Sequence, residues 1–264
     1  MERIRQIGNG DIADAVRLST EAGWNQLPED WSRLFDGMPR WCYGMEADGT
    51  IAAATTAWVY PGLAWIGMVL TLPAFRGRGF ARRVLEKLLD ELPVPLSRLD
   101  ATDMGRPLYT KLGYEDEYAV ERWIRTPSPP LPRVDLPPFT PELCALDREA
   151  FGYDRSALLT RLAGDGGTWS TANGFAMTRA GRNARFFGPC VAANDEDARL
   201  LLQAFLGEYA QEPVFWDLTE DKAEFAREFG FTPVRRLIRM RRGAADHTTA
   251  PARQVYALAG FEFG

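Results

Sequence analysis

The first half of the chain alternates between apolar runs typical of strands and runs with helical spacing. Residues 65–72 are mostly apolar and end at Pro73, which is typical of a buried strand. From residue 81 apolar side chains recur at helical spacing until Pro93, which indicates a helix. The same criteria predict strands at residues 3–7, 41–46, 51–59, 97–101 and 118–124, helices at residues 12–22 and around Tyr109, and a helix or loop at residues 28–35. Asp48-Gly49 is a hairpin turn in this pattern.

The second half repeats this order of elements. A hairpin is expected from strands at residues 175–179 and 185–191, and Gly181 lies in its turn. A helix from near Asp195 to Tyr209, a strand at residues 214–218 and a helix at residues 221–229 follow. Gly230-Phe231 then mirrors Gly113-Tyr114 of the first half. The pattern therefore predicts a degenerate internal repeat at the level of element order.

A proline-rich stretch separates the two halves. Residues 127–138 contain too many prolines for a helix or a central strand, so we expect a stiff extended linker. The predicted domains are residues 1–126 and residues 139–264.

The segment Arg76-Gly77-Arg78-Gly79-Phe80-Ala81 joins the predicted strand and helix of the first half. The free N–H groups of a first helical turn bind anions, and two glycines let the backbone approach a phosphate closely. No Gly-Lys-Ser/Thr closes the turn as in a Walker loop, and Arg82 stands where a dinucleotide fingerprint has its third glycine. The residues predict a phosphate cradle, whose ligand they leave open.

A second block, residues 99–114, sharpens this signal. It is a strand end, a short loop, a helix with Pro107 near its start, and a Gly113 C-cap that leads into another strand. Together the two blocks resemble the GNAT family of acetyl-CoA-dependent N-acetyltransferases over residues 1–126. The family's pyrophosphate loop, Arg/Gln-x-x-Gly-x-Gly/Ala, and its later Tyr-x-x-Leu-Gly-Phe/Tyr helix are matched by Arg76, Gly79 and Ala81 and by Tyr109, Leu112, Gly113 and Tyr114.

The resemblance implies an α+β fold of mixed α/β character. Each domain would have a central mixed, largely antiparallel sheet flanked by helices. The tandem arrangement resembles two-domain GNAT proteins with a YitH/HolE-type C-terminal domain, whose second half has lost cofactor binding. In keeping with this, residues 192–197 are acidic and lack glycine where a second cradle should lie, and Ala226 stands in the place of Tyr109.

The resemblance also implies acetyl-CoA as the acyl-donor co-substrate. Its pyrophosphate would bind the cradle, and its pantetheine arm would pair with the backbone of the preceding strand. Gly105 and Leu108 would serve packing and backbone approach to the cofactor. The residues implied in cofactor binding are Val69, Leu70, Thr71, Arg76, Gly77, Arg78, Gly79, Phe80, Ala81, Gly105 and Leu108.

Tyr109 is the candidate general acid. A phenol, with a pKa of about 10, can protonate or stabilise a departing thiolate whose pKa is about 8.5; the alternative is a packing role. The general base stays open: Glu21, Glu46 and Asp100 lie on elements that could border the site, but each is better explained as a surface or structural charge. No metal site is expected.

The acceptor side is predicted around the end of the first helix. Trp24 and Asn25 could hold a small polar amine there, although Trp24 could equally seal the helix against the sheet. Thr102 faces the same cleft in family members. Residues 151–155 either close that cleft or cap a helix at residues 155–162 through Asp154, and we favour the cap.

Composition narrows the alternatives. The net charge is −5 and the pI is near 5.2, so the arginines of residues 235–242 favour a charged sheet face or edge over a nucleic-acid site. Cys42, Cys144 and Cys190 have no metal-like spacing and are expected as reduced buried thiols. The only histidine, His247, lies in a polar stretch, which argues against Ser-His-Asp catalysis. Without an apolar run of membrane length or a leader pattern, a cytoplasmic location is expected.

The sequence thus favours an N-acetyltransferase that acetylates a primary amine of a small molecule by direct attack in a ternary complex. The alternatives are a non-catalytic acetyl-CoA-binding regulatory module and a protein-lysine acetyltransferase. We expect a monomer or homodimer, with no nucleic-acid or membrane partner.

Overall fold

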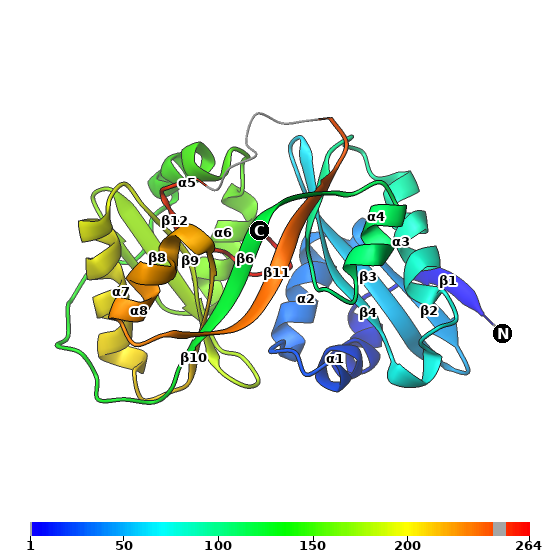
Figure 1. The fold of residues 1–264 in the computed structure, drawn as a ribbon, viewed down its shortest axis with the longest axis horizontal. Coiled ribbons are helices and arrows are strands. Elements are labelled where there is room, and N and C mark those ends of the chain that lie inside the picture. Colours follow the sequence, from blue (N-terminus) through cyan, green and yellow to red (C-terminus); the bar gives the residue numbers. More distant parts are fainter. Residues whose placement is uncertain (1, 245–251) are drawn as a thin grey trace.

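The computed structural model describes residues 2–244 and 252–264; His247 lies outside them. The first half contains two layers of helices around a sheet (Figure 1). Its elements are β1 (Arg3–Gln6), α1 (Ile12–Glu21), α2 (Pro28–Gly37), β2 (Cys42–Ala47), β3 (Thr50–Tyr60), β4 (Leu63–Thr71), α3 (Phe80–Glu91), β5 (Ser97–Ala101), α4 (Arg106–Lys111) and β6 (Glu115–Arg125). The helix-or-loop segment is therefore a helix, α2, which begins at a proline in its first turn.

The helices of the first half cover opposite faces of this sheet. Leu18 of α1 and Trp31 of α2 pack with Trp58 and Trp65 on one face, which we call the α1/α2 face. On the other face, side chains of α3 and α4 pack with those of β2 to β5. Asp48 and Gly49 both have positive φ at the turn between β2 and β3, as a tight hairpin requires.

The second half follows the same plan. Its elements are α5 (Cys144–Phe151), α6 (Ser156–Asp165), β7 (Thr168–Thr171), β8 (Gly174–Arg179), β9 (Arg185–Ala192), α7 (Asp195–Tyr209), β10 (Val214–Thr219), α8 (Ala223–Glu228), β11 (Thr232–Arg242) and β12 (Val255–Ala257). The hairpin, the long helix and β10 lie where the hydrophobic pattern predicts them. Sequence reasoning missed α5, β7 and β12, each of which is short or lacks clear periodicity.

The linker does not stand free between the halves. Residues 126–140 have no helix or strand, as predicted, but they lie along the second half. Leu131 and Val134 pack against the core around α7, and the Ser128 amide donates to the Ala210 carbonyl. The prolines therefore set an extended path that is buried on one side.

The two halves share one sheet because they exchange their last strands. The strand order is β1-β2-β3-β4-β5-β11-β6-β10-β9-β8-β7, and β12 pairs with β9. Hence β11, from the second half, lies between β5 and β6 of the first, and β6 lies between β11 and β10 (Figure 1). Residues 1–126 and 139–264 are consecutive in sequence but interleaved in space. The arginine-rich strand β11 is consequently central in the sheet, which excludes the edge and leaves the charged face of the two predicted alternatives.

Matched ion pairs hold the exchanged strands. Asp100 of β5 lies opposite Arg239 of β11, and Asp217 of β10 lies opposite Arg122 of β6. Each carboxylate accepts two hydrogen bonds from its arginine, at 2.8 and 3.0 Å for Asp100 and 2.7 Å twice for Asp217. Both carboxylates are fully buried. The internal repeat thus includes its central charge pairs.

Strand exchange predicts that the halves fold together. Residues 1–126 expressed alone would lack β11, so β5 and β6 would have no strand between them and Asp100 would be a buried charge without its arginine. We expect this fragment to be unfolded or aggregated by circular dichroism, and co-expression with residues 127–264 to restore a folded complex. A cooperative unfolding transition from a monomeric 1–126 fragment would contradict this.

Candidate functional site

Two parallel strands of the first half separate to form a wedge. β4 and β5 pair only at Ala64 with Ser97 and at Trp65 with Arg98. Beyond these pairs they diverge, so the β5-facing backbone of β4 after Trp65 has no strand partner. The wedge opens toward the carboxyl ends of both strands. It can accept an extended ligand that hydrogen-bonds to free backbone groups.

A bulge in β4 lies at the vertex of this wedge. The register with β3 shifts between the pair Thr56–Gly67 and the pair Ala54–Leu70. Met68, within the bulge, has a φ of +51°, a conformation that non-glycine residues rarely adopt. Bulges of this kind redirect backbone and side-chain groups at binding sites.

The predicted phosphate cradle lies at the open end of the wedge. Gly77 and Gly79 have φ values of +77° and +74°, and a Cβ at either would meet nothing within 4 Å. No side chain caps α3, whose N-cap is Gly79, so the amides of its first turn are free to bind an anion. Thr71, at the end of β4, has a buried hydroxyl with no hydrogen-bond partner among the described residues. An orphaned hydroxyl beside an open helix terminus fits a phosphate-bearing ligand.

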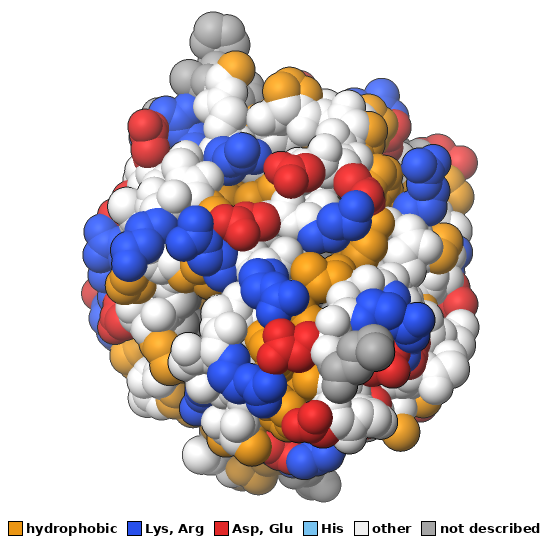
Figure 2. Space-filling view, turned by 90° about the vertical axis from the view of Figure 1, so that its right-hand side faces the viewer, with side chains coloured by type: hydrophobic (Ala, Val, Ile, Leu, Met, Phe, Trp, Pro, Cys, Tyr) orange, Lys and Arg blue, Asp and Glu red, His pale blue; other side chains and the backbone are white. Residues whose placement is uncertain are grey.

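The arginines of the cradle differ in their engagement. Arg78 of the cradle and Arg83 of α3 both pair with Glu2, at 2.8 and 2.6 Å. Arg76 is exposed, and among the described residues its side chain contacts only the Thr71 carbonyl, at 3.4 Å. Basic and acidic side chains are interspersed over this end of the molecule (Figure 2). Arg76 is therefore the cradle arginine with the least competition from carboxylates.

Tyr109 of α4 is buried on the face of the sheet that α3 and α4 cover. Only 8% of the residue is exposed, and its hydroxyl has no hydrogen bond to any described residue, in contrast to Tyr114, whose hydroxyl lies 2.8 Å from Ser97 Oγ. Burial raises the pKa of Tyr109 above its ordinary value, so the side chain is a neutral phenol with a proton to donate. The geometry leaves that proton uncommitted.

The predicted neighbours Gly105, Leu108 and Thr102 position Tyr109. A Cβ at Gly105 would lie 2.9 Å from the Tyr109 ring, so this position needs glycine for packing. Leu108 packs in the same core as Tyr109. Thr102 Oγ1 accepts a hydrogen bond from the Gly105 amide at 3.1 Å, which fixes the turn before α4. The hydroxyl keeps its own proton as a donor, so the predicted substrate contact of Thr102 stays a prediction.

Trp24 and Asn25 dock the second half. The side-chain Nδ2 of Asn25 donates to the Ala184 carbonyl at 2.9 Å. Its Oδ1 accepts from the backbone amides of Asn183 and Ala184 at 2.8 and 3.0 Å. Trp24 packs against the α1/α2 core and its carbonyl accepts from Arg182. The polar groups of Asn25 are thus engaged by the hairpin turn between β8 and β9. This corrects the prediction that Asn25 binds substrate.

The structure also shows the contacts of Asp154 and of the three carboxylates considered as general bases. Asp154 Oδ1 accepts from the Ser156 amide at 2.9 Å and so satisfies the first amide of α6, although Asp154 precedes the N-cap residue, Arg155. Glu21 pairs with Arg17, and Glu46 pairs with Arg3 and Arg5. Burial raises the pKa of Asp100 while Arg239 opposes that effect, and both Asp100 oxygens are held by Arg239. Asp100 therefore has no oxygen left to act as a base, whereas Glu21 and Glu46 each engage one oxygen in their ion pairs, Oε1 of Glu21 and Oε2 of Glu46.

The corresponding wedge of the second half is closed by the chain itself. β9 and β10 pair in parallel only from Val214–Arg185 to Trp216–Phe187. Where they diverge, β12 pairs with β9, and the Leu258 amide that follows it donates to the Asp217 carbonyl of β10. β12 thus fills the space that is open between β4 and β5.

The terminus that corresponds to the cradle is also closed. Asn194 caps α7 by accepting from the Asp197 amide at 2.9 Å. A cavity of about 490 Å³ remains beside it, but its lining mixes Arg199, Lys222 and Arg253 with Asp195, Asp221, Glu224 and Glu228. The position of Tyr109 is taken by Ala226, because the amide after each C-cap glycine bonds to these two carbonyls, Tyr114 N to Tyr109 O and Phe231 N to Ala226 O.

Further observations concern the rest of the chain. Cys42, Cys144 and Cys190 are free and buried, as expected. Within the described ranges, no helix is long and apolar enough to cross a membrane.

Comparisons with known proteins agree with this architecture. Residues 12–114 match the acetyltransferase (GNAT) family, and residues 143–257 match an acetyltransferase (GNAT) domain. The chain is 27% identical over 159 residues to the uncharacterized N-acetyltransferase YitH of Bacillus subtilis (strain 168). That match covers 57% of this chain and only 56% of YitH.

Solved structures share the fold over a longer stretch. A crystal structure of a candidate acetyltransferase from Pyrococcus horikoshii superposes with a TM-score of 0.86, covering 100% of this chain and 96% of that one, at 24% identity. A GCN5-related N-acetyltransferase from Kribbella flavida gives a TM-score of 0.58 over 92% of this chain and 72% of that one, at 19% identity. At such identities these structures support the fold alone. Because a GNAT acetyltransferase model matches each half, the chain belongs to the GNAT acetyltransferase family as a tandem two-domain member.

Proposed function

We propose that the protein transfers an acetyl group from acetyl-CoA to a primary amine of a small molecule, and that only the first half is catalytic. The observation that carries this proposal is the open wedge between β4 and β5, with the uncapped N-terminus of α3 at its mouth. The uncommitted hydroxyl of Tyr109 supports it, because Tyr109 packs in one core with Ile66 of β4 and Ala101 of β5. The second half has the same elements but neither an open wedge nor a tyrosine at the matching position.

The residues present fit acetyl-CoA. The amides of Gly79, Phe80 and Ala81, with Arg76, would hold the pyrophosphate, and the free edge of β4 at Val69–Thr71 would pair with the pantetheine arm. When bound, the thioester supplies the activated acetyl group. Tyr109 would give its proton to the departing thiolate, which is a better acid–base match than water provides.

Small amines are favoured over protein lysines as acceptors. A lysine on a protein surface needs an open groove on the α1/α2 face. That face is instead covered by the second half, whose side chains share one hydrophobic core with α1 and α2. The regulatory-module alternative has no observation in its favour as specific as the free hydroxyl of Tyr109.

The cradle predicts a sensitive position for acetyl-CoA binding. Gly79→Asp adds a negative charge at the N-terminus of α3, where the pyrophosphate should lie, so we expect at least a tenfold weaker affinity, about 1.4 kcal/mol. Isothermal titration calorimetry on the folded variant measures this. Gly49→Asp is a matched control, because Gly49 has a similar φ of +80° and equally open surroundings in the β2–β3 turn. Equal affinities for the two variants would place the cofactor elsewhere.

The closed second wedge predicts one acetyl-CoA per chain. β12 occupies the space between β9 and β10, and the acidic first turn of α7 repels phosphate. Calorimetric titration should therefore give a stoichiometry near one. Two equivalent sites would show that the second half binds the cofactor as well.

Tyr109 separates an enzyme from a sensor. Tyr109→Phe keeps the buried ring but removes the proton, so kcat should fall by roughly 10²-fold while acetyl-CoA affinity barely changes. The loss should be the same for every amine accepted, because the thiolate is common to all of them. Unchanged turnover, under conditions where chemistry limits the rate, would leave Tyr109 with a packing role only.

A further inference from the structure

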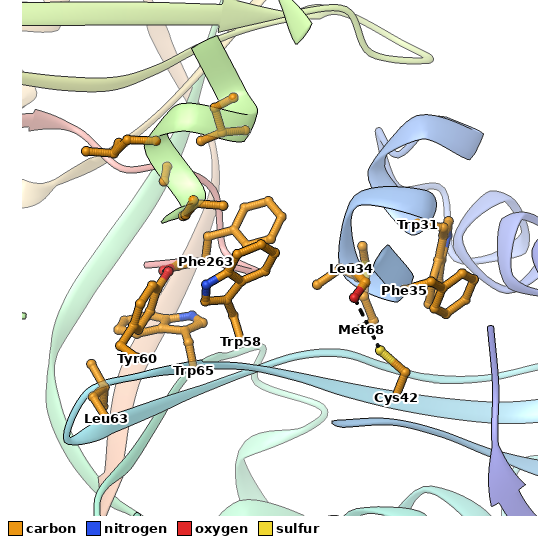
Figure 3. Packing of buried hydrophobic residues seen from close by; sticks show 14 of the residues in the cluster. Trp31, Leu34, Phe35, Cys42, Trp58, Tyr60, Leu63, Trp65, Met68 and Phe263 are labelled. Atoms are coloured by element: carbon orange, nitrogen blue, oxygen red, sulfur yellow. Dashed lines mark hydrogen bonds between the residues drawn. The ribbon is translucent and has the colours of Figure 1, made fainter. Parts of the chain in front are cut away.

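The last residues of the described chain cross from the second half into the first. After β12, residues 258–264 form a buried turn whose carbonyls are held by side chains of both halves. Tyr60 donates to Phe263 O at 2.7 Å and Trp65 donates to Phe261 O at 3.0 Å. Phe263 itself packs edge-on against Trp58, with ring centroids 5.5 Å apart (Figure 3). We call residues 258–264 the tail; it lies on the α1/α2 face of β3 and β4.

The tail places the Cα and Cβ atoms of Glu262 against Gly67, at the vertex of the wedge. A Cβ on Gly67 would lie 2.9 Å from Glu262 Cα and 3.0 Å from Glu262 Cβ, so Glu262 fills the space that a side chain at position 67 would occupy. Gly67 immediately precedes the bulge residue Met68. Its cross-strand partner Thr56 has a fully buried hydroxyl with no hydrogen-bond partner among the described residues. Polar groups therefore converge on the vertex from the face opposite Tyr109.

Glu262 differs from the other buried carboxylates of the described chain. Asp100, Glu117, Asp147 and Asp217 each give both oxygens to one arginine, and Asp30 gives Oδ1 to Arg33 and Oδ2 to the Leu27 amide. Glu262 gives only Oε1 to an arginine, Arg179, at 3.0 Å. Its Oε2 has no arginine partner within residues 2–244 and 252–264; it lies beside Gly260 of the same turn, and the carboxylate also accepts a hydrogen bond from the Glu262 backbone amide.

The charges around Glu262 favour a proton acceptor. Arg179 forms an ion pair with Glu262, and its Nε also lies 3.4 Å from Oδ1 of Asp30. Asp30 is itself paired with Arg33. Arg122 is a further cation near Glu262. Burial raises the pKa of Glu262, Arg179 opposes this, and Asp30 adds to it. A carboxylate with a raised pKa holds an accepted proton better than an exposed one does.

We propose that Glu262, supplied by the second half, is the general base that deprotonates the acceptor amine in the active site of the first half. This inference rests on the proposed function. It identifies the acceptor as a compact amine that is an ammonium ion in water, which the carboxylate attracts and then deprotonates.

The proton balance is complete without another reactant. The ammonium loses one proton to Glu262 Oε2, and its nitrogen lone pair forms the C–N bond as the C–S bond breaks. Tyr109 gives its proton to the thiolate, and the second proton lost by the nitrogen restores the Tyr109 phenol. The proton on Glu262 is released to water. The products are the amide, CoA thiol and one proton.

Glu262→Gln tests this assignment because it keeps the shape and one hydrogen bond to Arg179 but cannot accept a proton. For an alkylamine, kcat/KM of the wild type should fall as the pH drops through a pKa above the ordinary value of about 4.3. In the variant this dependence should disappear and kcat should fall by roughly 10²-fold. For an alkoxyamine, which is already unprotonated at neutral pH, the loss should be at least several-fold smaller.

Glu117→Gln is the matched control. It makes the same change at a buried carboxylate whose oxygens are both held by Arg98, so any loss should be equal for the two amines. If Glu262→Gln does not fold, Glu262→Asp keeps the charge but retracts it by one methylene, and should keep the pH dependence with a lower kcat for the alkylamine.

Different failures have different meanings. An active wild type with equal losses for both amines in Glu262→Gln, and an unchanged pH profile, would overturn the role of Glu262 and leave the proposed function standing. A wild type that binds acetyl-CoA but acetylates no amine in a broad panel would overturn both. Unchanged acetyl-CoA affinity in Glu262→Gln is expected, since Glu262 lies on the acceptor face.

Discussion

The exchange of β6 and β11 is the constraint on which the rest of this structure depends. Asp100–Arg239 and Asp217–Arg122 lie directly across the exchanged strands, and all four side chains are nearly or fully buried. Removing one partner of a buried pair typically costs about 3–5 kcal/mol, because the other charge is left without compensation. The pairs therefore penalise any arrangement in which either half keeps its own last strand.

The exchange also determines how the two halves divide their work. Once β11 lies beside β5, the chain that follows it must return to the second half, and β12 then enters the wedge between β9 and β10. The same segment continues as the tail to the α1/α2 face of β4, where Glu262 meets Gly67. One stretch of chain thus closes the second wedge and also contacts β4 at the vertex of the first. The closed wedge of one half and the base proposed for the other therefore have a single structural origin.

Sequence reasoning succeeded where local chemistry sets the structure. The glycines of the cradle, the Asp48-Gly49 turn, the bond of Asp154 to the first amide of α6 and the place of Tyr109 before Gly113 depend on backbone sterics and hydrogen bonds within a few residues. It failed for Asn25 because the sequence pattern of an asparagine after a helix is the same whether its side chain binds a substrate or the hairpin turn at Ala184. Glu262 gave no signal, since it stands in a short apolar tail with no motif around it.

The sequence by itself thus determined the order of elements, the two-domain repeat, the glycine turn before α3 and the place of Tyr109 in the helix before Gly113, because each follows from periodicity or from a short motif. Only the tertiary structure decided which strands pair, that β11 is central, that β12 fills the second wedge, and that Glu262 reaches the first. The physical reason is that these features depend on contacts between residues far apart in the chain. Asp100 meets Arg239, and Gly67 meets Glu262, and no local propensity encodes such partners.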